Sequence, residues 1–488
     1  MAAATPSERY LTTLCQQTFL RLWSWPNVYR DQLWSGGNTG KEVCDLLVVF
    51  DHHIFIFSDK HCAYPSSGNI GLDWSRWFKR AIFQSAKQIL GAERWLRQHP
   101  HRLFLDKDCT QRFPIHLPPI DEAIFHRIVV AHGAGERCIT THGGSGSLML
   151  MPHLLPEDHW NPSRQAFHPF AIGKIIEPNE FIHVIDDFSL DILLKTLDTV
   201  GDFALYLERK AEFLLSGRLV AAAGEEELLA YYLRRIDATG KHCFEDTTDK
   251  SNMVIAEGLW GNFQMHPERL AQLEANAISY SWDRLIDHFA KHLLEDTQYF
   301  RTNPSVSEQE KGFRLLAREN RTRRRMLAKS LHTALQRGDE SDRFVRVGLP
   351  SSPGDPHYVF LTLKPRKDRS YDEYRTVRGN LLEAYCMATR LKFPDAKDIV
   401  GIASEPWTHE GGRSEDFIYM NATIWSKELE AEAMELQGQL NLLTDIRMVK
   451  TTESEYPLHR NQMQGKGRNR NKPCSCGSGL KYKKCCGK

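Results

Sequence analysis

Apolar and polar positions in the first hundred residues predict one helix, a β-hairpin and a second helix. Residues 7–23 place apolar side chains near helical spacing, with Ser7 as the expected N-cap, and "SWPNVYRD" is expected to end this helix. Residues 43–50 and 53–60, "VCDLLVVF" and "HIFIFSDK", consist largely of β-branched and aromatic residues and flank the turn "DHH". An amphipathic helix with a basic face is expected at 74–97. The order predicted for residues 1–105 is therefore α-β-β-α.

Later segments alternate between β-rich and helical patterns, so we predict a multidomain α/β (α+β) protein. The linker "LPSSPGDP" precedes a small α/β unit, and the polar run "HRNQMQGKGRNRNK" near the C-terminus is expected to be a flexible tether. The predicted domains are an N-terminal α/β domain at 1–115, a β-rich segment at 116–190, a helical region at 191–345, a small α/β domain at 346–458, a linker at 459–472 and a cysteine-rich end at 473–488.

Composition restricts the classes of protein that this chain can be. Its 488 residues exceed one ordinary core, and 41% hydrophobic and 10% aromatic content favour folded domains. The net charge of +1 gives no global field, so a nucleic-acid partner must meet local basic patches. The N-terminus does not resemble a secretory signal, and no apolar run reaches the roughly 18–20 residues of a membrane span. Scattered cysteines suit a reducing compartment, so we expect a cytoplasmic protein.

The last residues, "KPCSCGSGLKYKKCCGK", contain four of the eleven cysteines in almost no apolar sequence. Four thiolates can hold Zn²⁺ tetrahedrally, and Gly477 and Gly479 would allow the chain to reverse between the cysteine pairs. Such a segment would depend on the metal for most of its folding free energy. The alternative is a disordered tail with incidental cysteines. The basic residues around it could contact phosphates or an acidic protein surface, or could only make the tail soluble.

"CSCGSGLKYKKCC" resembles the SEC-C motif, the zinc-binding tail of the SecA translocation ATPase. The resemblance implies a structural zinc ion held by Cys474, Cys476, Cys485 and Cys486, and a role in docking a protein or a ribosome. The rest of the chain does not resemble SecA, since "SGGNTGKE" lacks the spacing and the terminal hydroxyl of a phosphate-binding loop.

The predicted hairpin carries acids and a lysine at the ends away from its turn. Glu42 and Asp45 come before or early in the first strand, and Asp59 and Lys60 close the second. Carboxylates there could hold Mg²⁺ or Mn²⁺ for phosphodiester hydrolysis, while Lys60 orients the attacking water. A two-residue turn would pair Asp45 with Ser58, whereas a three-residue turn would pair it with Asp59. The sequence leaves both registers open.

This arrangement resembles the PD-(D/E)XK nucleases, whose core runs α-β-β-β-α-β. By resemblance Asp45 is the first acid, Lys60 the lysine and Glu42 an additional acid, while Gln84 or Lys87 would come from the following helix. The sequence departs from the motif at Ser58, which stands where the second acid is expected, because Asp59 comes one residue late. A bulge near Ser58 would be needed to bring Asp59 to the site.

The resemblance implies a metal-dependent nuclease that cleaves DNA or, as an alternative, RNA. By analogy such a protein would serve prokaryotic restriction or anti-phage defence. The rival expectation is a non-enzymatic adaptor with a degenerate nuclease fold and a docking zinc tail.

Two further segments have open alternatives. "HGAGERCITTHGGSGS", which includes His132 and His142, could form a phosphate loop or histidine metal site, or a glycine-rich connection without a ligand. The arginines near 318–325 predict a surface for nucleic acid or an acidic partner, or a solvated helix.

Overall fold

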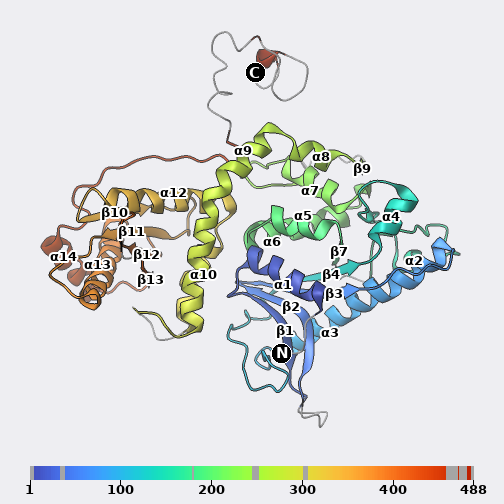
Figure 1. The fold of residues 1–488 in the computed structure, drawn as a ribbon, viewed down its shortest axis with the longest axis horizontal. Coiled ribbons are helices and arrows are strands. Elements are labelled where there is room, and N and C mark those ends of the chain that lie inside the picture. Colours follow the sequence, from blue (N-terminus) through green and yellow to red (C-terminus); the bar gives the residue numbers. More distant parts are fainter. Residues whose placement is uncertain are drawn as a thin grey trace. The chain divides into compact units, whose positions relative to one another are not determined.

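The computed structural model describes residues 5–32, 39–177, 181–244, 252–299, 306–410, 412–457, 471 and 481–484 (Figure 1). The chain divides into two compact units, the first reaching Leu270 and the second running from Ala271 to His459. Each unit has its own sheet and helices, so the predicted mixed α/β (α+β) architecture is confirmed.

The main sheet of the first unit has five strands in the order β1-β2-β3-β4-β7. β1, β2 and β3 form an antiparallel meander, and β4 and β7 continue parallel to β3. The strands are β1 (Ser24–Arg30), β2 (Lys41–Phe50), β3 (His53–His61), β4 (Ile124–His132) and β7 (Ile182–Asp186). The predicted hairpin is confirmed, and its turn consists of Asp51 and His52.

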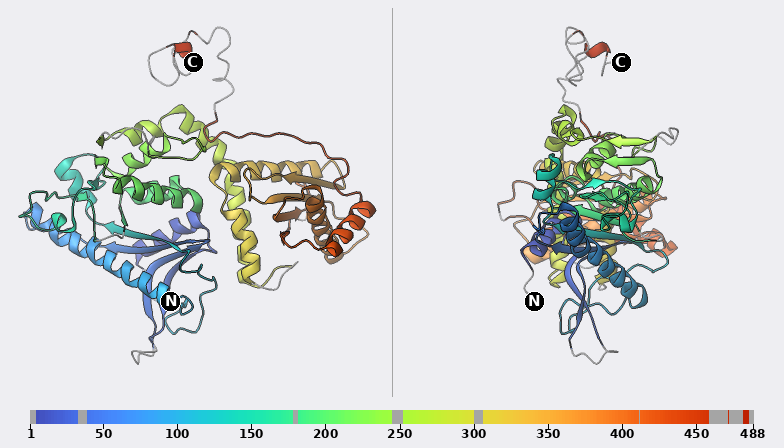
Figure 2. Two further views of the ribbon diagram at one scale, coloured as in Figure 1. Left: turned by 180° about the vertical axis from the view of Figure 1, so that it is seen from behind. Right: turned by 90° about the vertical axis from the view of Figure 1, so that its right-hand side faces the viewer.

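Helices cover both faces of this sheet (Figures 1 and 2). On one face, Phe19 of α1 (Pro6–Phe19) and Phe203 of α6 (Val200–Leu215) pack against Phe55 of β3, with ring centroids 5.2 and 6.0 Å from that of Phe55. On the other face, α3 (Gln84–Gln98) packs against β2, β3 and β4. The predicted helix at 74–97 is α2 (Ile70–Phe78) joined to α3 by a π-helical turn, Lys79–Phe83.

The segment expected only to break the first helix is a strand, β1. Pro26 is tolerated because β1 is at the edge of the sheet, where a missing N–H does not interrupt a ladder. The observed order is therefore α-β-β-β-α rather than α-β-β-α. Helix α1 is capped by Thr5 instead of Ser7: the Thr5 hydroxyl accepts from the Glu8 N–H, and the Glu8 carboxylate accepts from the Thr5 N–H.

The remainder of the first unit is a small second sheet with short helices. Strands β5 and β6 pair in parallel, and β8 joins β5 to β9. These elements are α4 (Gly135–His142), β5 (Met149–Leu150), β6 (Ala171–Ile172), α5 (Ser189–Thr196), β8 (Leu219–Ala222), α7 (Glu225–Leu233), β9 (Met253–Ile255) and α8 (Leu259–Gln264), with α9 (Pro267–Asn276) spanning the boundary between units.

The second unit has a four-stranded sheet in the order β10-β11-β12-β13. Buried Arg378 joins its parts, because its guanidinium pairs with the buried carboxylates of Glu405 and Asp416 at 2.8 and 2.6 Å. The elements are α10 (Tyr280–Leu294), α11 (Val306–Ala317), α12 (Arg321–Gly338), β10 (Arg343–Gly348), β11 (His357–Leu363), α13 (Tyr371–Lys392), β12 (Asp398–Ser404), β13 (Glu415–Asn421) and α14 (Lys427–Leu440).

The predicted domain boundaries at 115 and 345 both fall inside sheets. β4 and β7 complete the sheet begun by β1–β3, so 1–115 and the β-rich segment 116–190 share one core. Residue 345 lies within β10, and the region 191–345 expected to be helical includes β8 and β9 as well. Local sequence patterns identify strands, but they do not show which strands pair when these are far apart in the sequence. The domain boundaries predicted at 115 and 345 therefore divide strands or sheets that belong together.

Most of the arginine-rich stretch is buried rather than solvated, although Arg318 is partly exposed. Arg324 and Arg325 are fully buried, and Arg321 and Arg324 pair with opposite oxygens of Asp283 at 2.6 and 2.7 Å. Arg325 pairs with Glu453 at 3.2 Å. These buried ion pairs therefore connect α12 with Asp283 of α10 and with Glu453 within the second unit.

Candidate functional site

A bulge in β2 brings two acids of the hairpin to the same groove. Val28 pairs with Cys44, but Tyr29 pairs with Glu42, so β2 carries one extra residue, Val43, at this point. A bulge interrupts the alternation of side chains, which otherwise would send Glu42 and Asp45 to opposite faces. Both acids consequently line one groove of about 450 Å³.

The groove is enclosed by β2 on one side and α3 on the other. Ser58 of β3 contributes to its floor, and the Ser58 hydroxyl lies 3.5 Å from the Gln88 side-chain oxygen. Its cationic side chains are Arg30, Lys41 and Lys87. A groove lined by both carboxylates and cationic side chains could bind a metal ion and a phosphate together.

Glu42 and Asp45 carry raised pKa values. Burial, followed by the charges of Asp45 and Glu8, raises the pKa of Glu42 to about 7. Burial also raises the pKa of Asp45 to about 6, with the charges of Glu8 and Asp59 adding to the effect and hydrogen bonds from the Asp59 N–H and Ser58 opposing it. Carboxylates that repel each other in a partly buried groove favour binding a cation.

The register of the hairpin follows the two-residue turn. The pairs run from Phe50 with His53 to Leu46 with Phe57. Continued by one residue, this register places Asp45 opposite Ser58. By alternation Ser58 and Lys60 share a face, but Lys60 is exposed and is not among the residues that line the groove. A bulge near Ser58 would have been needed to bring Asp59 to the site, but β3 pairs with β4 without a register shift from His53 to His61. The bulge is in β2, and it brings Glu42 rather than Asp59 to the groove.

The Asp59 carboxylate lies away from the groove, although its backbone N–H donates to Asp45 Oδ2 at 2.6 Å. Its Oδ1 lies 2.6 Å from Nε2 of His132, and Nδ1 of His132 lies 2.6 Å from Asp187 Oδ1. The ends of the parallel strands β3, β4 and β7 bring these three residues together. The structure thus separates the Asp59 side chain from those of Glu42 and Asp45.

His132 links two carboxylates as an imidazolium. Burial alone would lower the pKa of His132, but hydrogen bonds to Asp187 and Asp59, with their charges, outweigh burial and raise it to about 9. The next residue, Gly133, has φ +104 and donates its N–H to Asp187 Oδ2 at 2.8 Å. A Cβ at this position would lie 2.2 Å from the Cys62 carbonyl oxygen, so only glycine fits this turn.

Two contributions to the site were missed from sequence. Glu8 of α1 adds its charge to Glu42 and Asp45, and no local pattern in the sequence connects it with the hairpin. His132 was named for a possible phosphate loop or histidine metal site, but its link to Asp59, 73 residues earlier, was not predicted because nothing local connects the two residues. Of the two helix residues expected near the metal, Lys87 lines the groove, with its Nζ 4.3 Å from the Phe83 ring centroid, whereas Gln84 is not among the lining residues.

The four tail cysteines, Cys474, Cys476, Cys485 and Cys486, lie outside the described residues. That they bind zinc therefore stays a prediction.

Comparison with known proteins identifies the tail. Residues 470–488 match the model of the SEC-C motif. No curated protein and no solved structure matches the chain. None of the helices in the described part of the chain is long and apolar enough to cross a bilayer.

Proposed function

We propose that the first unit is a metal-dependent nuclease whose site is the groove of Glu42 and Asp45. The observation that carries this proposal is the β2 bulge, which brings two carboxylates of raised pKa to one groove that Arg30, Lys41 and Lys87 also line. The substrate class is DNA, with RNA as the alternative, and a role in prokaryotic restriction or anti-phage defence is the corresponding cellular proposal.

The order of elements in the first unit supports the proposal. α1, β1, β2, β3, α3 and β4 follow the α-β-β-β-α-β order of the PD-(D/E)XK core, with β4 parallel to β3. Asp45 and Lys60 stand at the positions of the first acid and the lysine of that motif. Because Ser58 occupies the position of the second acid, Glu42 and the nearby charge of Glu8 are proposed to replace it.

The donor set fits Mg²⁺ or Mn²⁺, which prefer carboxylate and hydroxyl oxygens. Glu42 and Asp45 would hold the cation, and Asp59 would not, since its carboxylate engages His132. When bound, the cation would stabilise the negative charge that develops on the phosphate. Lys60 would orient the attacking water, and Arg30, Lys41 and Lys87 would contact backbone phosphates.

Incubation of the full chain with plasmid DNA, and separately with RNA, tests this proposal. We expect cleavage with Mg²⁺ or Mn²⁺, none with a chelator, and a loss of about 100-fold or more in rate for Lys60→Ala. Lys392→Ala, at an exposed position in the second unit, is the matched control and should cleave normally. Cleavage that is independent of metal or unchanged in Lys60→Ala contradicts the proposal. Absence of cleavage under every condition favours the adaptor alternative.

For the tail, we propose a structural zinc ion held by Cys474, Cys476, Cys485 and Cys486, in a segment that docks a protein or ribosome. The SEC-C match and the chemistry of four thiolates support this assignment. In the double variant Cys474→Ser/Cys476→Ser, metal analysis should find about one zinc equivalent per chain fewer than in the wild type. An unchanged zinc content would reject the assignment.

A further inference from the structure

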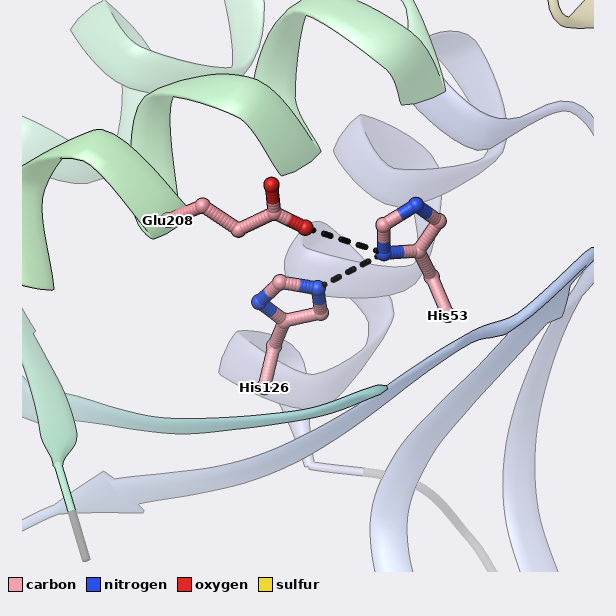
Figure 3. Close-up of side chains that lie close together, drawn as sticks. All are labelled: His53, His126 and Glu208. Carbon is pink, nitrogen blue, oxygen red and sulfur yellow. Dashed lines mark hydrogen bonds and ion pairs between the residues drawn. The ribbon is translucent and has the colours of Figure 1, made fainter. Parts of the chain in front are cut away.

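A second group of metal-ligand side chains lies at the other end of the main sheet. His53 begins β3, His126 lies early in β4, and Glu208 is on α6 (Figure 3). One ligand atom from each residue lies within 4.8 Å of the other two. His53 is five residues along β3 from Ser58, which lines the nuclease groove, and this corresponds to about 17 Å of extended strand. This group is therefore separate from the nuclease groove.

The three side chains converge on one point. His53 Nδ1 lies 3.0 Å from His126 Nε2 and 3.6 Å from Glu208 Oε1. Ligands bound tetrahedrally at 2.0–2.1 Å from Zn²⁺ are separated by about 3.4 Å. The two distances bracket this value, so small side-chain rotations would accommodate the ion.

Glu208 presents a buried carboxylate oxygen to this point, and the nearest ring nitrogen, Nδ1 of His53, is beyond hydrogen-bond distance at 3.6 Å. Its Oε1 is buried and has no hydrogen-bond partner among the described residues. A buried carboxylate oxygen without a donor is costly, and a cation would remove that cost.

The two imidazoles are suited to act as ligands. Burial, together with the charges of His53 and Arg127, lowers the pKa of His126 to about 3, and burial also lowers the pKa of His53. Neutral imidazole has the free lone pair that a metal requires. The ring of His126 also stacks on Phe55, with centroids 4.4 Å apart, which fixes its orientation.

We propose that His53, His126 and Glu208 form a binding site for a transition-metal ion, Zn²⁺ by ligand type, that fastens α6 to β3 and β4. Two imidazoles and one carboxylate are a common zinc donor set, and three protein ligands leave one coordination position for water. Because the ligands come from elements far apart in sequence, the bound metal would stabilise the folded unit. This proposal does not depend on the nuclease proposal.

The test uses the full chain with Cys474→Ser/Cys476→Ser, so that the tail thiolates do not dominate the zinc content. In this background we expect about one zinc equivalent per chain, which His53→Asn and Glu208→Gln should each remove. His52→Asn, at the exposed histidine next to His53, is the matched control and should keep the zinc. Both test positions are partly exposed, so neither substitution should prevent folding.

Cobalt provides an independent readout of the same site. Co²⁺ added to the tail variant should give visible absorption without a thiolate charge-transfer band, and the absorption should be lost in Glu208→Gln. Binding that is absent from the tail variant, or unchanged by both ligand substitutions, overturns the proposal.

Discussion

Asp45→Asn is expected to abolish metal-dependent cleavage while leaving the first unit folded. Loss of a carboxylate ligand removes several kcal/mol of charge stabilisation in the transition state, so the rate should fall by at least about 100-fold. The side-chain oxygen of the introduced asparagine can still accept the Asp59 N–H that Asp45 Oδ2 accepts at 2.6 Å. The thermal midpoint without metal should therefore be equal to or higher than that of the wild type, because substitution also relieves the repulsion among Asp45, Glu42 and Glu8.

The matched control for this result is Asp51→Asn in the turn of the same hairpin. Asp51 is exposed and has φ +53, a conformation that asparagine adopts readily, so the control should fold and cleave like the wild type. Kinetics with purified proteins under excess Mg²⁺, with circular dichroism melting, measure both properties. Equal cleavage by Asp45→Asn and the wild type would remove Asp45 from the site.

His132→Ala is expected to destabilise the first unit by about 3 kcal/mol or more at pH 7. The substitution leaves the fully buried Asp59 carboxylate without its imidazolium partner, and an unpaired buried charge has a cost of this order. Urea unfolding measures the change in the free energy of unfolding. His101→Ala is the control, since His101 is exposed and the substitution of an exposed residue should cost less than about 0.5 kcal/mol.

The stabilisation by His132 should depend on pH in a defined direction. The folded-state pKa of about 9 exceeds the ordinary histidine value, so the stabilisation is complete below about pH 6.5 and is lost as pH rises through about 9. The difference in unfolding free energy between wild type and His132→Ala should therefore be larger at pH 7 than at pH 10. A difference that is constant over this range would show that His132 contributes by packing and not as a cation.

Periodicity in the sequence predicted the elements whose burial follows a simple pattern. The alternating apolar residues around "DHH" gave the β2–β3 hairpin, and helical spacing gave α1 and α3. β1 was missed because Pro26 ordinarily marks a break, and its position at the sheet edge is a tertiary property. Arg324 and Arg325 were misassigned because their burial depends on Asp283 and Glu453, which are distant in sequence.

The candidate site was predictable only as far as its residues lie on one hairpin. The sequence identified Glu42, Asp45, Asp59 and Lys60 but left the register open, and the turn of Asp51 and His52 resolves it. The bulge that brings Glu42 to the groove depends on how β2 pairs with β1, a strand that the sequence did not predict. The group of His53, His126 and Glu208 joins three elements that are far apart in the chain and has no local signal.

The most direct test of the central claim is a crystal structure of the full chain with Mn²⁺ present, inspected at the groove of Glu42 and Asp45. The account predicts an anomalous difference peak between the carboxylates of Glu42 and Asp45, and no such peak in crystals of Asp45→Asn. Manganese that binds elsewhere, with none between these two carboxylates, would contradict it.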